Sequence, residues 1–259
     1  VSTCIELLHT FMLVHDDIID CSALRRGRPT MHKLLEKTTA CSNPKKLGTD
    51  LAIVSGDILY ALAIDAFLSI KEEKGRKEKA LRYFIQTAVF TAMGEFIDTL
   101  HGMKRLEAVT ESDVFLNYSL KTARYTFDCP LVVGAILAGA PPPETKYLSE
   151  LGLLIGQAFQ IQDDIIGVFD SQENIGKSNL SDIAESKKTL LVCHAHRVLR
   201  GPVRKKFLHH FNQPRPGHRD LIEIRKILQS AGSLEYCLRE VEQRLARAQV
   251  LINRLTMKP

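Results

Sequence analysis

Long apolar segments with helical periodicity recur along this chain and leave few folds open to it. The first, Val1–Ile19, is apolar on nearly every side, which predicts a helix buried at the centre of a bundle. Further helices are expected at residues 47–70, 80–106, 113–140 (interrupted near Pro130), 144–168, 187–199 and 233–255. Neither strand-like alternation nor a solenoid repeat is found. These patterns predict an all-α fold, a single-domain antiparallel helical bundle over residues 1–259.

Polar segments separate the expected helices. Solvated loops or turns are predicted at residues 21–29, 36–46, 71–79, 170–181 and 213–217, and the segment around 204–206 is basic and surface-like. Thr110 is predicted to be an N-cap, with Asp113 at the N3 position of a capping box. The chain opens inside its first helix without a cap or polar lead-in, so we expect N-terminal helices to be missing from this sequence.

Charge and composition set broader limits. The net charge of +5 is compatible with an anionic substrate, but the basic residues are spread along the chain and do not indicate nucleic-acid binding. The six cysteines are widely separated and show no CxxC or Cys/His ligand spacing, which argues against a zinc site or a disulfide framework. A reducing cytoplasm fits this pattern best. The longest uncharged run, residues 129–143, is broken by Gly and Pro and too short to cross a membrane, so no stable membrane insertion is expected.

An acidic cluster ends the first helix. Asp16 and Asp20 lie one turn apart and leave the same helix face, with Asp17 beside them. Carboxylates among apolar side chains are costly to desolvate without a cation, and Mg²⁺ binds carboxylates together with substrate phosphates. Arg25 and Arg26 follow, and guanidinium groups bind phosphate oxygens bidentately. A helix terminus with solvated acids and a basic loop is the alternative that this segment alone leaves open.

A second apolar helix repeats the arrangement. Asp163 and Asp164 follow the apolar run in FQIQDDIIG. Two such helices facing each other would hold metals between them, with a diphosphate bridging the metals. Lys121, Lys177 and Lys187 would then neutralise the remaining phosphate charge.

Together these motifs resemble the trans-isoprenyl diphosphate synthases, or polyprenyl synthetases, which make farnesyl, geranylgeranyl and longer diphosphates. DDIID with RRGRPT is similar to the family's first aspartate-rich motif and FQIQDDIIG to its second. LKTARYTF, GDILYALA and DIAESKKTLL resemble the segments that accompany them, and the resemblance extends to about Leu191. It implies a helical bundle around a deep central cavity, and a homodimer.

The resemblance also implies a mechanism. Metal-bound diphosphate leaves an allylic substrate, isopentenyl diphosphate attacks the cation, and the released diphosphate accepts the proton. The implied cofactor is Mg²⁺, as three ions, and the implied ligands are Asp16, Asp17, Asp20, Asp163 and Asp164. The implied substrate-binding residues are Arg25, Arg26, Lys121, Thr122, Gln160, Lys177 and Lys187. Of these, Lys121, Thr122 and Gln160 would face the carbocation as catalytic residues, and Arg26 would bind isopentenyl diphosphate.

Two departures from the family pattern stand out. Gly167 takes the place of a third aspartate in the second motif, which weakens the metal role of that turn. The family's upstream Gly-Lys-x-x-Arg segment, and a histidine that follows it, bind isopentenyl diphosphate, and no segment here is matched to them. If the native chain began at Val1, condensation should fail.

Product length depends on the depth of the cavity. Phe11 and Met12, five and four residues before Asp16, are expected to form its floor. A bulky Phe there, with two residues between Asp17 and Asp20, resembles the geranylgeranyl-producing members and predicts a twenty-carbon product. A farnesyl or longer product is the alternative.

Three other functions remain open at this stage. One is a non-catalytic partner subunit that regulates a synthase. Another is a terpene cyclase, which also uses aspartate-bound metals but has little need of Arg26. The third is a metal phosphohydrolase built on His15 and Asp16. Glu95 and Asp98, at helical spacing, are interpreted as solvated acids near the cavity and left outside the site.

Overall fold

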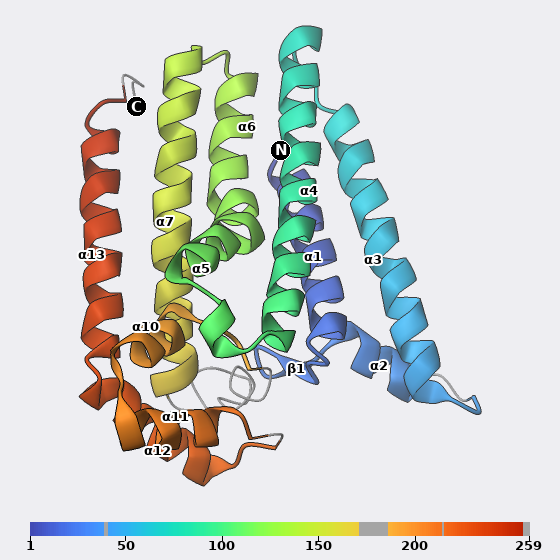
Figure 1. The fold of residues 1–259 in the computed structure, drawn as a ribbon. Helices are drawn as coiled ribbons and strands as arrows, with labels where there is room; N and C mark the ends of the chain where they lie inside the picture. The colour runs from blue at the N-terminus through green and yellow to red at the C-terminus, as the bar shows by residue number, and fades with distance from the viewer. Residues whose placement is uncertain (39–40, 171–185, 214, 256–259) are drawn as a thin grey trace.

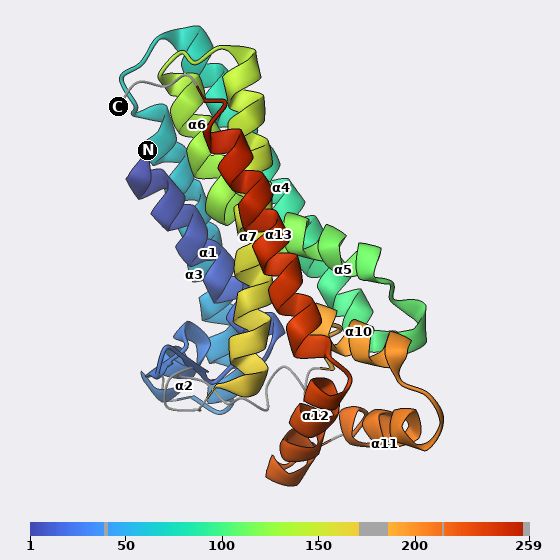
Figure 2. The same cartoon turned by 90° about the vertical axis from the view of Figure 1, so that its left-hand side faces the viewer.

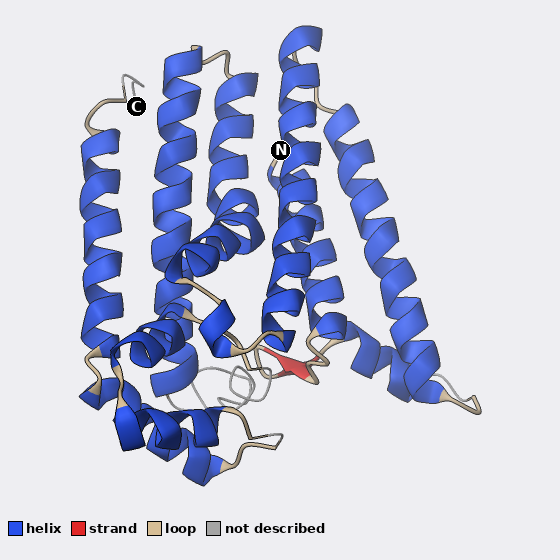
Figure 3. Cartoon of the chain, in the orientation of Figure 1, coloured by secondary structure: helices blue, strands red, loops and turns tan. Residues whose placement is uncertain are grey.

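The computed structural model describes residues 1–38, 41–170, 186–213 and 215–255, and these are almost entirely helical (Figures 1 and 3). The α-helices are α1 (Ser2–Ile19), α2 (Met31–Thr38), α3 (Pro44–Leu68), α4 (Lys74–Met103), α5 (Glu111–Asn117), α6 (Cys129–Leu137), α7 (Pro142–Phe169), α10 (Leu190–Val198), α11 (Gly201–Phe211), α12 (His218–Ser230) and α13 (Ser233–Ile252). A 3₁₀ turn, η1 (Leu106–Ala108), and a π-helix, η2 (Tyr118–Asp128), complete the helical elements.

The long helices form a bundle in which three of them end at the same side. α1, α4 and α7 run in the same direction, so their C-terminal ends gather at the lower end of the molecule in Figure 1. The short helices α10, α11 and α12 lie at that end too, as the turned view in Figure 2 also shows. Residues far apart in the sequence are thereby brought to one end of the bundle, provided that they lie in the last turns of these helices.

Two apolar clusters form most of the core. One joins α1, α3, α4 and α6 around Leu8, Phe67 and Phe84, which are at most 1% exposed. The other joins α7 and the C-terminal helices around Ile161 and Phe207. Helix α7 can serve as a central element because its buried apolar residues recur at helical spacing along its whole length. The expected bundle is confirmed.

Helix boundaries follow local chemistry that was partly visible in the sequence. The capping box of Thr110 and Asp113 is confirmed, with both reciprocal hydrogen bonds present. Asn43 and Glu73 also cap helices through their side chains. Glu73 starts α4 inside the segment predicted to be a solvated turn, so that prediction is wrong for residues 74–79.

Several other local predictions are corrected. Helices α2, α11 and α12 were not predicted, because they are short and mainly polar. The end of α2 lies in the expected polar loop at 36–46, and α11 contains the basic segment interpreted as surface. Helix α10 begins at Leu190, capped by Thr189, and not at Lys187. Helix α1 is less buried than its composition suggests, since most of its side chains are only partly covered in this structure.

A two-stranded hairpin was also missed. Strands β1 (Leu24–Arg25) and β2 (Arg28–Pro29) pair antiparallel, and Arg26 and Gly27 between them both have positive φ. This is the backbone of a tight two-residue hairpin turn, which Asn-Gly usually occupies. Arg26 sits there despite the steric cost of a left-handed conformation for a residue with a Cβ. The hairpin turns Arg26 outward and leaves Arg25 beside the end of α1.

Helices α3 and α4 leave apolar stripes uncovered. On α4 the exposed residues recur every three or four positions and are Ile85, Val89, Met93, Phe96, Leu100 and Met103. On α3 they include Leu51, Val54, Ile58 and Leu62. Within the described residues α3 alone is long and apolar enough to span a membrane by length and composition, with 22% of its apolar window buried. Exposed apolar stripes of this extent indicate that something covers them.

Candidate active site

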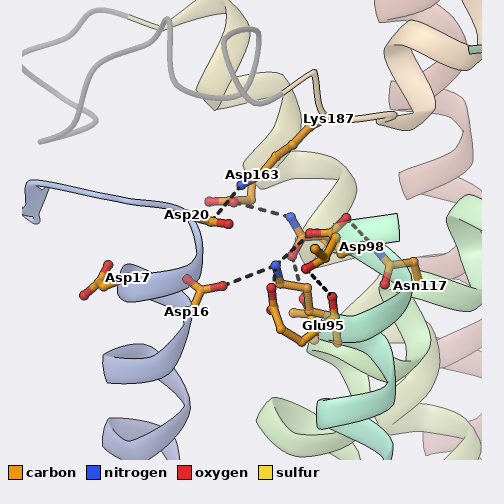
Figure 4. A network of polar contacts seen from close by, with 12 residues as sticks. Asp16, Asp17, Asp20, Glu95, Asp98, Asn117, Asp163 and Lys187 are labelled. Atoms are coloured by element: carbon orange, nitrogen blue, oxygen red, sulfur yellow. Dashed lines mark hydrogen bonds and ion pairs between the residues drawn. The ribbon is translucent and has the colours of Figure 1, made fainter. Parts of the chain in front are cut away.

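Acidic and basic side chains from three helix ends converge at the lower end of the bundle. Figure 4 shows Asp16 and Asp20 from α1, Glu95 and Asp98 from α4, and Asp163 from α7 pointing toward a common centre. Carboxylate oxygens of Asp16, Asp20 and Glu95 lie within 4.8 Å of one another. This donor set fits a hard divalent cation such as Mg²⁺, which binds oxygen ligands. Asp163 of the second aspartate cluster thus lies near Asp16 and Asp20 in Figure 4, and shared metal binding by the two clusters stays a prediction.

Lys121 lies at the centre of this group. Its Nζ is 3.2 Å from Asp16 Oδ1, 2.9 Å from Glu95 Oε2 and 2.7 Å from Asp98 Oδ2. Asn117 holds Asp98 from the other side, because its Nδ2 donates to Asp98 Oδ1 at 2.9 Å. Four-fifths of each ion-paired side chain is buried, with 19–21% exposed. The lysine thus balances a concentration of negative charge that would otherwise be costly to bury.

Two backbone features place Lys121 there. It belongs to η2, and a π-helix changes the register of side chains that an α-helix would present, often at functional sites. Gly94 on α4 lies against the same residue, since a Cβ at position 94 would be 2.4 Å from the backbone nitrogen of Lys121. Only a glycine allows α4 to approach η2 this closely.

The charges shift the pKa values of the group. Burial would raise the pKa of Asp16, but Lys121, Arg25 and Lys187 outweigh it and hold that pKa below its usual value. Burial raises the pKa of Glu95 to about 7 against the opposing effect of Lys121. The pKa of Lys121 is raised by the neighbouring carboxylates, which outweigh its own burial. Lys121 is therefore a permanently charged member of the site.

The second aspartate cluster connects to the first through polar side chains. Gln160 accepts a hydrogen bond from the Thr122 hydroxyl at 2.7 Å and donates to Asp164 at 3.0 Å. The buried Asp164 also accepts from the Tyr118 hydroxyl, which in turn accepts from the backbone N–H of Leu190. Asp163, one residue earlier, is exposed toward the pocket. Asp164 is placed to position Gln160 and Tyr118, and Asp163 to meet a ligand.

Arg25 binds the first cluster directly. Its Nη2 is 2.6 Å from Asp16 Oδ2, and its Nε is 2.8 Å from Asp17 Oδ1. Asp17 is buried and points away from the common centre in Figure 4. The geometry therefore does not favour the prediction that Asp17 is a metal ligand: it orients Arg25 instead. Arg26 is exposed at the tip of the hairpin.

Of the remaining lysines predicted to bind phosphate, one joins the site and the other lies outside the described residues. Lys187 Nζ lies 3.4 Å from Asp20 Oδ2, so it joins the site although it precedes α10 and does not begin it. Lys188 donates to the backbone oxygen of Gly102 at 2.8 Å, which anchors the segment to the end of α4. Lys177 lies outside the described residues. A cavity of about 70 Å³ at this end is lined by Asp98, Asn117, Tyr118, Lys121, Thr122, Gln160, Asp163, Asp164, Lys187, Lys188 and Thr189.

Sequence reasoning missed several members of this site. Glu95 and Asp98 were interpreted as solvated, although their helical spacing beside Gly94 was a usable signal. His9, seven residues before Asp16, was also overlooked. Burial lowers the pKa of His9, Glu6 opposes that shift, and Arg26 and Arg25 add to it. It stacks on Tyr125 of η2 with ring centroids 5.7 Å apart.

The expected floor residues lie in the apolar cluster that begins about one turn before Asp16 on α1. The ring of Phe11 packs against Tyr60 of α3 at 5.0 Å and against His15 at 4.8 Å. Met12 is partly buried in the same cluster, with Leu8 one turn deeper. Their influence on product length stays a prediction.

Comparison with known proteins assigns this helical bundle to the isoprenoid synthase class. Residues 1–228 match the polyprenyl synthetase family, and the chain belongs to that family. A short chain isoprenyl diphosphate synthase of Methanothermobacter thermautotrophicus is 36% identical over 195 residues, which are 75% of this chain and 55% of the relative. A geranylgeranyl diphosphate synthase of Sulfolobus acidocaldarius is 31% identical over 98% of this chain and 73% of its own length.

A solved structure shares the fold. It is the geranylgeranyl pyrophosphate synthase of Corynebacterium glutamicum complexed with isoprenyl diphosphate and magnesium, with a TM-score of 0.86 and 26% identity, covering 98% of this chain and 72% of that one. The chain thus spans little more than half the length of the first of these relatives.

Proposed function

We propose that the protein is a Mg²⁺-dependent prenyltransferase that condenses isopentenyl diphosphate with an allylic diphosphate to give geranylgeranyl diphosphate and diphosphate. The observation that carries this proposal is the convergence of Asp16, Asp20 and Asp163 from two distant helices beside Lys121 and Lys187. The family membership and the similarity to isoprenyl and geranylgeranyl diphosphate synthases support it. Six free cysteines are consistent with the expected cytoplasmic location.

The residues of this chain would act mainly by electrostatic stabilisation of a leaving diphosphate. Asp16, Asp20 and Asp163 would hold Mg²⁺, in three ions, which neutralises diphosphate oxygens as a Lewis acid when bound. Lys121 and Lys187 already lie among these carboxylates and would add donors to the departing diphosphate. Thr122 and Gln160, hydrogen-bonded to each other, would direct oxygen dipoles at the allylic cation.

Isopentenyl diphosphate would bind on the hairpin side of α1. Arg26 is exposed there, and the partly buried His9 lies on α1 two turns before Asp16. Among the described residues no side chain pairs with Arg26, so a diphosphate could bind it without displacing one. Arg25, in contrast, already binds Asp16 and Asp17. We therefore assign the isopentenyl site to Arg26 with His9, and the positioning of the aspartates to Arg25.

A homodimer is part of the proposal. The stripes on α3 and α4 are apolar, lie on adjacent long helices and remain exposed in the described residues. A second copy that presents the same stripes would bury them in a two-fold arrangement. Val89 is 52% exposed at the middle of the α4 stripe.

The test is to incubate the full-length protein with Mg²⁺, isopentenyl diphosphate and, separately, dimethylallyl, geranyl or farnesyl diphosphate. The proposal expects a twenty-carbon diphosphate ester. A hydrocarbon product would identify a terpene cyclase, and nucleotide hydrolysis without carbon–carbon bond formation a phosphohydrolase. Activity seen only after a second prenyl synthase subunit is added would identify a regulatory partner subunit. Farnesyl or longer esters would overturn only the product length.

A further inference from the structure

Glu95 belongs to neither aspartate motif, yet its carboxylate lies among the proposed metal ligands. It lies on α4, between the end of α1 and η2, and its carboxylate oxygen is within 4.8 Å of oxygens of Asp16 and Asp20. Its side chain is 19% exposed and forms an ion pair with Lys121. A mostly buried carboxylate beside a diphosphate site repels the negatively charged substrate unless a cation neutralises the carboxylate.

We propose that Glu95 is a third protein ligand of the metal held by Asp16 and Asp20. Without the metal, the Lys121 ammonium neutralises Asp16 and Glu95, and the metal displaces it from both when it binds. The proposal rests on the proposed function for the presence of the metal. It assigns Glu95 a direct role in metal binding, whereas Asp98 keeps Lys121 within the site.

The contacts of Lys121 support the exchange. Its ammonium group is paired with Asp16 and Glu95, which are two of the three proposed metal ligands. It is also paired with Asp98, which is not one of them. Asp98 is held independently, because Asn117 donates to its second oxygen at 2.9 Å. A divalent cation among Asp16, Asp20 and Glu95 would repel the ammonium from the first two partners. Lys121 would retain Asp98 and turn its freed donors to a diphosphate oxygen.

This arrangement makes opposite predictions for two neighbours. Loss of the Glu95 carboxylate should weaken metal binding, because a ligand is removed. Loss of the Lys121 charge should strengthen the binding of metal alone, because a competing cation is removed. If Lys121 were solely a diphosphate ligand, its loss would not change metal binding in the absence of diphosphate.

The experiment measures Mn²⁺ binding to the metal-free full-length protein, followed by the free Mn²⁺ signal in electron paramagnetic resonance. We expect Glu95→Gln to weaken Mn²⁺ binding by about tenfold or more, as loss of a ligand or its support does. Asp98→Asn is the matched control, since it removes the same charge from the same helix and the same lysine. It should change the affinity by about twofold at most, because Asp98 is not a ligand in the proposed site and its charge is already taken up by Lys121 and Asn117. Lys121→Gln should tighten binding.

Two results would overturn the inference: equal losses in Glu95→Gln and Asp98→Asn, or unchanged Mn²⁺ binding in Lys121→Gln. Circular dichroism of each variant excludes misfolding as the cause. Prenyl transfer by the unmodified protein is measured separately. If the protein is active but the variants do not show the expected Mn²⁺ affinities, only the role of Glu95 is rejected. An intact metal pattern without any prenyl transfer rejects the proposed function instead.

Discussion

Lys121 shows how one side chain can connect three helices. It belongs to η2, yet its ammonium contacts carboxylates of α1 and α4. When no metal ion is bound, the ion pairs of Lys121 hold together the end of the bundle where catalysis is proposed. Because each carboxylate is mostly buried, removing the lysine alone leaves uncompensated charge, which is more costly than removing a surface ion pair.

Arg26 represents a balance between stability and binding. Its positive φ is costly for an arginine, whereas asparagine tolerates this turn conformation. Arg26→Asn should therefore raise the free energy of unfolding by about 0.5–1 kcal/mol, measured by urea denaturation. The same change should raise KM for isopentenyl diphosphate, because a phosphate ligand is lost.

Arg28→Asn is the control for this prediction. It removes another exposed arginine, from β2, where φ is not positive, and should bring no gain in stability. A similar gain in both variants would show that relief of general positive charge, and not of backbone strain, is responsible.

Phe11 carries the prediction of product length. Phe11→Ala removes a ring that packs against Tyr60 and should deepen the cavity, so products longer than twenty carbons should be found by chromatography of the hydrolysed alcohols. The cost in stability should be about 2–4 kcal/mol, since the ring is only partly buried. Phe115→Ala, another partly buried ring distant in sequence from α1, should leave the product unchanged. An unchanged product from Phe11→Ala would show that Phe11 is not the floor.

At the scale of elements, the approach of α4 to η2 decides whether the site exists. Gly94→Ala would place a Cβ 2.4 Å from the Lys121 backbone and force the two helices apart. We expect kcat to fall by about a hundredfold, the effect of a displacement near 1 Å in a catalytic site. The free energy of unfolding should fall by about 1–3 kcal/mol through overpacking.

The control for that prediction is Gly134→Ala on α6. A Cβ there meets nothing within 4 Å, so the change should be neutral or slightly stabilising in a helix. If both variants retained full kcat in the prenyl transfer assay, close contact at Gly94 would not position Lys121.

The elements that could be predicted from the sequence are those whose burial imposes a periodic pattern. Helices α1, α3, α4 and α7 are long and apolar, so their existence was predictable. Helices α2, α11 and α12 are short and mostly polar, and they gain stability from packing that composition does not reveal. The hairpin was hidden because two-residue strands show no alternation and Arg-Gly is an unusual turn pair.

The site could be predicted as far as its chemistry was concentrated in short motifs. Asp16, Asp20 and Asp163 lie in such motifs, and the structure brings them to one end of the bundle. Lys121, also in such a motif, lies there too, because it pairs with Asp16. Glu95 contributes through the contact of α4 with η2, a property of the packed fold and not of its own segment.

At the scale of the whole molecule, the stripes on α3 and α4 predict association. Val89→Glu places a charge in the middle of the α4 stripe and should shift the protein from dimer to monomer in sedimentation velocity. Val203→Glu is the control, because Val203 on α11 is 47% exposed against 52% for Val89 but lies outside both stripes. A monomeric unmodified protein, or a dimer that survives Val89→Glu, would contradict this interface.

The central claim is that α1 and α7 serve one shared metal and diphosphate site. Crystals of the full-length protein soaked with Mn²⁺ and inorganic diphosphate test it by anomalous scattering. We expect Mn²⁺ peaks between Asp16, Asp20 and Asp163, bridged by a single diphosphate that also contacts Lys121. Mn²⁺ bound to one helix alone, with the diphosphate elsewhere, would contradict the account.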